Sequence, residues 1–301
     1  MTGRVDDSVA SEGDSRAGFL LALAAYLIWG ALPLYLHLVN HISLPEVLAQ
    51  RILWSVPVAM VVLLALGRTA DLRRALGSGR MLAMAALTAV LVSFNWGVYL
   101  YTIQSGQVIS AALGYYINPL FSILLGAMVL RERLTRLQWA AVALAGLAVA
   151  VLTLEAGRLP LASLALTLSW GLYALAKRAL PIGPNQGFTL EVMILTPFAL
   201  GYLAWLWGRG ELAFGATGGL DMALLMGCGV LTAVPLMLYA NGAKRLKLTT
   251  IALMQYIAPT FVFLIAVFVF GEPFGGAKLF AFPMIWGALA LYSVDLWLRR
   301  R

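Results

Sequence analysis

The sequence predicts an all-α integral membrane protein with ten transmembrane helices. Of its 301 residues, 62% are apolar and only 11% are charged, whereas soluble domains are about 45–50% apolar and about 25% charged. The mean hydropathy is +0.89. Since a water-soluble fold has too little interior to bury this much apolar surface, the composition excludes a soluble enzyme, a disordered chain and a disulfide-rich scaffold.

Ten apolar runs, each near the roughly 20 residues that cross a bilayer as a helix, are separated by charged residues or by Gly, Pro and Asn. They are continuously apolar, unlike the alternating strands of a transmembrane β-barrel. The first is long enough to span, so it is expected to remain as a helix behind a disordered cytoplasmic tail at 1–17. The runs fall at about 18–39, 45–66, 81–103, 108–130, 136–154, 159–176, 188–207, 222–242, 249–270 and 277–298.

The distribution of basic residues predicts the orientation of these helices. All but four of the 21 Lys and Arg residues fall in the N-terminal tail, in alternate links or at the C-terminus. By the positive-inside rule, both termini are predicted to be cytoplasmic, including the basic end at 299–301. This rule also accounts for the net charge of +8, so no nucleic-acid partner is expected.

An internal repeat divides the chain into two halves. Segments 114–132 and 254–272 lie 140 positions apart and share seven identical residues, and Trp-Gly recurs in the first and sixth runs. Five-helix repeats are therefore predicted at 18–154 and 155–298, and because five is odd, the second repeat enters the membrane inverted. The matched pairs that are not Leu or Val are Trp29/Trp170, Gly30/Gly171, Tyr99/Tyr239, Tyr116/Tyr256, Ile117/Ile257, Pro119/Pro259, Phe121/Phe261, Glu132/Glu272 and, near an offset of 145, Glu46/Glu191.

Several motifs along the chain resemble the EamA-type, ten-helix members of the drug/metabolite transporter superfamily, and within it the RarD family. They include LLALAAYLIWG (20–30), EVLAQRILWS (46–55), LGYYINPL (113–120), LRERLTRLQW (130–139) and RLKLTTIALMQYIAPT (245–260). The resemblance covers about 18–298. It implies a permease of the cell inner membrane, in a family whose members are proposed to export drugs, amino acids and other metabolites.

Polar and aromatic groups inside the spans are the candidates for a substrate cavity, because such groups are costly against lipid. An aromatic cavity with few hydrogen-bonding groups suits amphiphilic or aromatic solutes; ordinary packing is the alternative for each residue. Pro119 and Pro259 are predicted hinges, since proline removes a backbone donor and kinks a helix, with static kinks as the alternative. The predicted cavity residues are Trp29, Arg51, Asn95, Trp96, Tyr99, Tyr116, Asn118, Trp170, Tyr239, Gln255 and Tyr256.

Charged residues near the helix ends leave several alternatives open. Arg51, about 9 Å into the second run, is either an anion contact such as one for a substrate carboxylate, a snorkelling side chain, or an ion-pair partner of Glu46. Lys177 is expected to be a topology anchor, with a role at the inner mouth as the alternative. Glu132 and Glu272 are each expected to close one end of the bundle through a hydrogen bond or ion pair.

The acidic residues fall in the tail, in links or near helix ends, which favours gradient-driven uniport by alternating access over a carboxylate proton relay. Proton-coupled antiport and a non-transporting sensor or scaffold are the alternatives.

No phosphate-binding loop, catalytic pair or metal-ligand cluster is apparent, so neither enzymatic activity nor a cofactor or metal is expected. The expected partners are a small-molecule substrate and the lipid bilayer. A monomer is expected, and a dimer through the nearly nonpolar helices 136–154 and 277–298 stays open.

Overall fold

The computed structural model describes residues 15–67, 69–129, 134–243, 245–246 and 248–298. Within these ranges it contains helices and no strands, so the prediction of an all-α protein is confirmed there. The helices are α1 (Arg16–Leu38), α2 (Leu44–Ala65), α3 (Thr69–Leu76), α4 (Gly79–Gln104), α5 (Val108–Val129), α6 (Arg136–Ala156), α7 (Leu161–Ala179), α8 (Pro184–Arg209), α9 (Gly219–Ala243), α10 (Leu248–Met254), α11 (Ile257–Leu264), the π-helical η1 (Ile265–Val269) and α12 (Lys278–Leu298). The predicted ends at 1–14 and 299–301 lie outside the described residues.

The helices follow the predicted apolar runs closely. Nine runs each coincide with one helix, whereas 249–270 is divided among α10, α11 and η1. In the described part of the chain, α1, α2, α4, α5, α6, α8 and α9 are long and apolar enough to cross a membrane, which makes this a multi-pass membrane protein. The short α3 was not predicted, because half of its sequence TADLRRAL is polar and it buries only Leu72 and Ala75.

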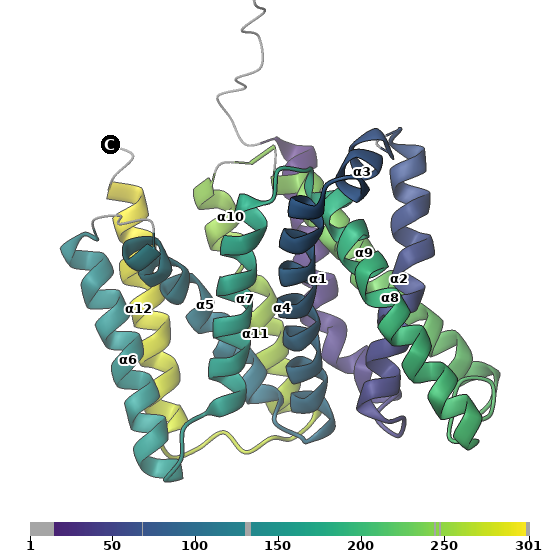
Figure 1. The fold of residues 1–301 in the computed structure, drawn as a ribbon. Coiled ribbons are helices and arrows are strands. Elements are labelled where there is room, and N and C mark those ends of the chain that lie inside the picture. Colours follow the sequence, from purple (N-terminus) through teal and green to yellow (C-terminus); the bar gives the residue numbers. More distant parts are fainter. Residues whose placement is uncertain (1–14, 68, 130–133, 244, 247, 299–301) are drawn as a thin grey trace, which may run out of the picture.

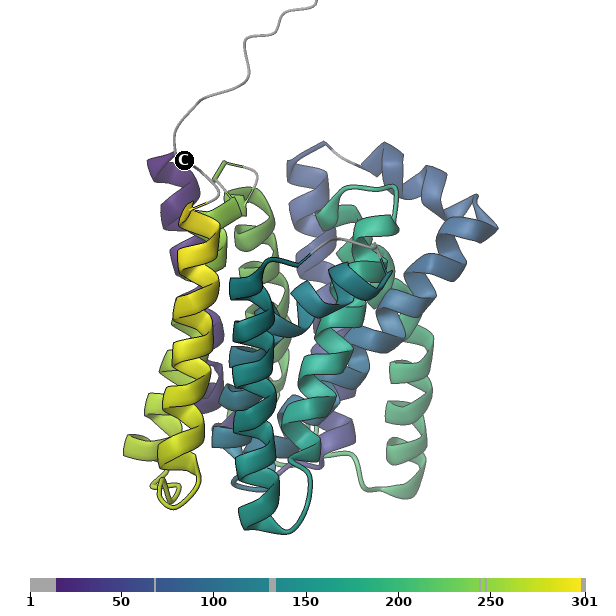
Figure 2. The same ribbon diagram turned by 90° about the vertical axis from the view of Figure 1, so that its left-hand side faces the viewer.

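The bundle has two ends with different contents (Figure 1). The start of α1, the end of α12 and the whole of α3 lie at one end, which we call the terminal end. The opposite end, called the loop end, carries the links 39–43, 105–107, 157–160, 210–218 and 270–277. Figure 2 shows α6 and α12 side by side at one edge of the bundle, where they pack on each other.

Two close helix contacts occupy positions that the sequence repeat relates. A Cβ atom at Gly30 in α1 would lie 2.6 Å from the Cβ of Phe261 in α11. A Cβ atom at Gly171 in α7 would lie 2.5 Å from Cδ1 of Phe121 in α5. The repeat pairs Gly30 with Gly171 and Phe261 with Phe121, so the same glycine–phenylalanine contact occurs twice, each time between a helix of one half and a helix of the other.

The two predicted hinge prolines differ in their helices. The chain turns at Gln255 and Tyr256, between α10 and α11. This break has a local cause, since the ring of a helical proline clashes with the carbonyl four residues earlier, and Pro259 lies four residues after Gln255. Pro119 lies inside the uninterrupted α5. A hinge role for either proline stays a prediction.

Candidate functional site

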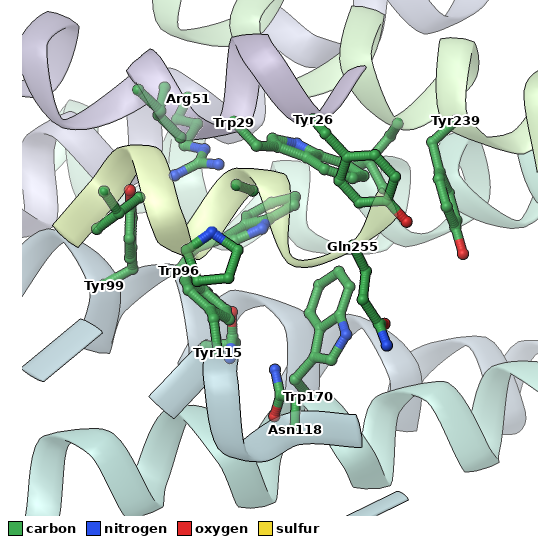
Figure 3. A pocket seen from close by; sticks show the side chains of 16 residues that line it. Tyr26, Trp29, Arg51, Trp96, Tyr99, Tyr115, Asn118, Trp170, Tyr239 and Gln255 are labelled. Carbon is green, nitrogen blue, oxygen red and sulfur yellow. Dashed lines mark hydrogen bonds between the residues drawn. The ribbon is translucent and has the colours of Figure 1, made fainter. Parts of the chain in front are cut away.

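A central pocket of about 140 Å³ lies where seven segments meet: α1, α2, α4, α5, α7, α9 and the stretch from Gln255 into α11. Seven of its lining side chains are aromatic, and Arg51 is its one formal charge (Figure 3). The pocket is thus mostly apolar with a few polar groups. Its lining residues are Tyr26, Trp29, Leu32, Arg51, Asn95, Trp96, Tyr99, Tyr115, Asn118, Trp170, Leu236, Tyr239, Gln255, Ala258, Pro259 and Val262.

A second cavity of about 490 Å³ lies beside the central pocket, on the side of the terminal end. The two share Trp29, Trp170, Leu236 and Tyr239 as lining residues. The second cavity extends past Lys177 to Arg178 and other residues where α7 ends and α8 begins, and Arg178 is exposed. The two cavities are therefore adjacent, and the second is the one nearer the terminal end.

The loop end is tied together instead by a buried carboxylate. Glu46, at the start of α2 and only 1% exposed, accepts hydrogen bonds from the backbone N–H groups of Ala213 (3.1 Å) and Phe214 (2.9 Å) in the link before α9. The hydroxyl of Tyr35 in α1 donates to the carbonyl oxygen of Leu224 in α9 over 2.8 Å. These contacts hold α1 and α2 against the α8–α9 link and α9.

A second carboxylate acts at the same end. Glu272 accepts hydrogen bonds from the N–H groups of Val108 and Ile109 at the start of α5, the latter over 2.8 Å. Burial raises the pKa of Glu272 above its ordinary value, although both N–H donors favour the ionised form. The predicted hydrogen bond of Glu272 is confirmed, whereas Glu132 lies outside the described residues.

Arg51 reaches the central pocket without a carboxylate partner. Its Nε donates to Oγ1 of Thr232 in α9 over 2.6 Å, and its guanidinium lies 4.8 Å from the centroid of the Trp96 ring. The side chain is 4% exposed, and Nη1 has no hydrogen-bond partner. The proposed ion pair with Glu46 is wrong, because Glu46 is occupied by backbone N–H groups; snorkelling is wrong as well, because the guanidinium is buried.

Asn95 holds two helices together while facing the pocket. Its Nδ2 donates to the carbonyl oxygen of Leu166 (3.1 Å) and to Oγ of Ser169 (2.9 Å), both in α7. Its Oδ1 accepts a longer bond of 3.4 Å from the Tyr115 hydroxyl. The side chain therefore ties α4 to α7 and has little hydrogen-bonding capacity left for a ligand.

The structure brings nine of the eleven predicted cavity residues to the central pocket, together with the predicted hinge Pro259. Tyr116 is elsewhere: its hydroxyl is 2.8 Å from Oγ1 of Thr260, and its ring packs against Phe282 and Trp286. Tyr256 is the cap residue just before α11 and does not line the pocket. The nine are Trp29, Arg51, Asn95, Trp96, Tyr99, Asn118, Trp170, Tyr239 and Gln255.

Sequence reasoning missed Tyr26 and Tyr115, which line the pocket. Successive helical residues point about 100° apart, so Tyr115 faces the pocket where its neighbour Tyr116 does not. The repeat marked Tyr116 because Tyr256 matches it. Tyr26 is three residues before Trp29, a spacing that places both on one helix face, and this signal could have found it.

An ion pair lies beside the second cavity. Nζ of Lys177 is 2.5 Å from Oε1 of Glu191, which is fully buried, and the Tyr173 hydroxyl donates to Oε2 over 3.3 Å. The sequence places Glu191 near the start of the apolar run 188–207, but α8 begins earlier, at Pro184, so Glu191 lies two turns inside the helix. Lys177 therefore neutralises a buried carboxylate in addition to its expected role as a topology anchor. Among the described residues, no three His, Cys, Asp or Glu side chains gather as metal ligands.

A helical bundle of apolar helices around an internal aromatic pocket is typical of a polytopic transporter, and comparison with known proteins supports this class. The model of the EamA-like transporter family matches residues 16–154. The chain is 39% identical to Protein RarD of Streptomyces exfoliatus, over 95% of this chain and 90% of that protein. It is 37% identical to Protein RarD of Escherichia coli, over 93% and 95%. The chain belongs to the EamA-like transporter family as a RarD-like member, and is a multi-pass membrane transporter.

Two further comparisons concern another RarD protein and a solved structure with a similar fold. A Pseudomonas aeruginosa protein called chloramphenicol-sensitive protein RarD is 30% identical over 93% of this chain and 95% of its own length. A solved crystal structure superimposes with a TM-score of 0.60 at 22% identity, covering 92% of this chain and 97% of the other. At that identity the match concerns the fold alone.

Proposed function

We propose that the protein exports small amphiphilic or aromatic solutes, such as amino acids, other metabolites or drugs, across the cell inner membrane by alternating access. The observation that carries this proposal is the central pocket with a second cavity beside it on the terminal-end side, set against the hydrogen-bonded loop end. A pocket reached from one side only is what alternating access requires in one of its states.

Two observations support the orientation and the architecture of this transporter. Basic residues gather at the terminal end, as expected of a cytoplasmic face with both termini inside. The matched contacts Gly30–Phe261 and Gly171–Phe121 favour two inverted five-helix repeats, 18–154 and 155–298. Rocking of one repeat against the other would close the terminal end and open the loop end.

The pocket chemistry favours a gradient-driven uniporter. None of the residues that line the central pocket is acidic. The pocket therefore has no carboxylate that could bind and release a coupled proton where the solute binds. The alternative is proton-coupled antiport, and the buried Glu191–Lys177 pair beside the second cavity is what favours it.

Efflux from proteoliposomes tests the proposal. Vesicles are preloaded with labelled aromatic and neutral amino acids, with 3-phenylpropionate or with chloramphenicol, first without an ion gradient and then with a pH gradient. Saturable, protein-dependent efflux without a gradient is expected. Efflux only with the pH gradient would establish the antiport alternative, and no efflux in either condition would contradict export of these solutes.

A matched pair of variants ties any efflux to the pocket. Trp170→Ala removes a ring shared by both cavities and is expected to reduce efflux about tenfold or more, since burial of an aromatic ring contributes several kcal/mol to binding sites. Trp207→Ala removes a ring that is 76% exposed on α8 and is expected to leave efflux unchanged. Equal rates in both variants would remove the pocket from the transport path.

A further inference from the structure

The strongest unexplained feature of the molecule is an unneutralised cation at its centre. Arg51 is the one formal charge in the lining of the pocket, and its Nη1 has no hydrogen-bond partner. The four ion pairs of the described residues join other side chains, and none involves Arg51. A buried charge is costly unless it is paired and hydrogen-bonded. The cavity therefore retains an unsatisfied preference for an anion.

The neighbours of Arg51 hold the guanidinium in place without neutralising it. Oγ1 of Thr232 accepts a hydrogen bond from Nε–H, and the guanidinium carbon lies 4.8 Å from the centroid of the Trp96 ring. Neither contact gives the buried terminal nitrogen Nη1 an acceptor. Guanidinium groups recognise carboxylates through directed, charge-assisted hydrogen bonds, so one carboxylate is the group that fits this position.

The rest of the pocket is suited to an uncharged, largely aromatic body. Its lining has no second charge, and Tyr26, Trp29, Tyr99, Tyr115 and Trp170 contribute ring surface. Figure 3 shows these rings around the same space that Arg51 enters. The ligand that matches both parts carries one carboxylate at the end of an apolar or aromatic group.

A primary ammonium group has no comparable partner in this pocket. The lining contains no carboxylate, and its two side-chain amides, Asn118 and Gln255, offer only neutral oxygens. The rings of Tyr26, Trp29 and Tyr239 pack on one another with centroids 5.6–5.7 Å apart, which leaves no cage between them in which a cation could lie over each face. Zwitterionic amino acids would thus bury an uncompensated positive charge.

We infer that the central pocket selects aromatic or apolar monocarboxylate anions lacking an ammonium group, with Arg51 as the carboxylate contact. This inference rests on the proposed transport function and names the substrate class of the same site. It has a consequence for energetics: a uniporter of such an anion moves one negative charge. An inside-negative membrane then drives export with no coupled proton.

Binding to the purified protein is the first measurement. Calorimetric titration compares 3-phenylpropionate, its methyl ester, L-phenylalanine and 2-phenylethylamine, which share the aromatic group and differ in charge. We expect 3-phenylpropionate to bind about ten to a hundred times more tightly than the other three, as charged hydrogen bonds contribute roughly 1.5–3 kcal/mol. Equal or tighter binding of phenylalanine or of the ester in the wild-type protein would overturn the inference without any variant.

A variant pair then assigns the contact. Arg51→Gln is expected to remove the preference for 3-phenylpropionate over its ester, whereas Arg74→Gln, on the exposed side of α3, is expected to retain it. Thermal unfolding and gel filtration show whether each variant is folded. If Arg51→Gln does not fold, the ester comparison in the wild-type protein still decides the matter. Retention of the full preference by folded Arg51→Gln would overturn the role of Arg51.

Charge movement separates the inference from the proposed function. Proteoliposomes with a tenfold potassium gradient and valinomycin are expected to accumulate labelled 3-phenylpropionate towards tenfold on the positive side, above protein-free vesicles. Potential-independent transport of phenylalanine or chloramphenicol, with no binding of the carboxylate, would overturn the inference and leave the transporter function standing. Carboxylate binding without transport of any solute would contradict the transporter function and leave the pocket selectivity standing.

Discussion

The two ends of the bundle use buried glutamates in different ways. At the loop end, Glu46 and Glu272 bind backbone N–H groups across helix boundaries, and α2 packs closely along α9. At the terminal end, Glu191 binds the side chains of Lys177 and Tyr173 beside an open cavity. Glu46 and Glu272 each bind backbone groups of the other half, and they lie at the end that hydrogen bonds hold together. Glu191 binds side chains of its own half, and it lies at the end with the second cavity.

The difference has a basis in the sequence. Glu46 in α2 and Glu191 in α8 match when the two halves are aligned, so one carboxylate position is shared. The lysine is not shared, because Leu36 stands in α1 at the position that Lys177 holds in α7, by the spacing that relates Trp29 to Trp170. The two halves therefore differ in charge at this position, because only the second half contains the Lys177–Glu191 ion pair.

Removing Lys177 is expected to produce the largest effect on stability. Lys177→Met leaves the fully buried Glu191 carboxylate without its cation, which costs about 3–5 kcal/mol for a buried pair. A value near 3 kcal/mol is expected, because Lys177 is 18% exposed and water reaches it through the cavity. Thermal unfolding in detergent micelles measures the loss.

The double variant Lys177→Met/Glu191→Gln provides the matched control. It removes both charges and is expected to recover most of the lost stability, since no unpaired ion remains. If the single and double variants unfold at the same temperature, the Lys177–Glu191 pair does not stabilise the terminal end. The proposed difference between the two ends would then be wrong.

Weakening Glu46 is expected to open the loop end. Glu46→Gln replaces a carboxylate that accepts two N–H bonds by an amide with one acceptor, a loss of about 1.5–3 kcal/mol. The readout is labelling of Leu32→Cys, in the pocket wall, by an impermeant maleimide added from the loop-end side, in a Cys228→Ser background. Labelling is expected to become about tenfold faster or more.

Glu211→Gln is the control for this measurement, because Glu211 lies in the same link as Ala213 and Phe214 but pairs with Arg209 on the surface. Its labelling rate is expected to match that of the parent. Unchanged labelling in Glu46→Gln would show that the loop end is held closed by packing rather than by this carboxylate.

The positions of the long helices could be predicted from the sequence because each prediction averages hydropathy over about twenty residues. A single polar residue within a span then changes the average little. The sequence was insufficient for α3, which is short and half polar, and for the break at Gln255, which precedes its cause at Pro259 by one turn. Composition and motifs thus predict the helices well and their irregularities poorly.

The candidate pocket was predictable as a set and less so residue by residue. Rarity of polar and aromatic groups within the spans marked Arg51, Asn118 and Trp170, which the structure brings together. Which of two neighbouring tyrosines faces inward depends on a rotation of about 100°, and boundary errors of a few residues exceed that. The partners of Glu46 lie in a distant link, so no local pattern could reveal them.

The smallest expected effect concerns pH and the second loop-end carboxylate. Burial raises the pKa of Glu272 above its ordinary value of 4.5, so the folded protein holds this proton more tightly than the unfolded chain does. The stability it contributes is therefore present below pH 4.5 and is lost as the pH rises through the raised pKa. Relative to Glu272→Gln, the wild-type unfolding temperature is expected to rise slightly as the pH falls through this window. The shift is expected to be smaller than the two effects above, since Glu272 is partly solvated.

Glu211 supplies a comparison of opposite sign within the loop end. Its hydrogen bond to Arg209 lowers the pKa of Glu211, so its contribution is present above its ordinary pKa and is lost as the pH falls. The difference between wild type and Glu211→Gln should therefore change in the opposite direction to that of Glu272→Gln. If both differences change in the same direction, burial does not dominate at Glu272, and its bonds to Val108 and Ile109 hold the carboxylate ionised. Glu272 would then close the loop end in the same way as Glu46.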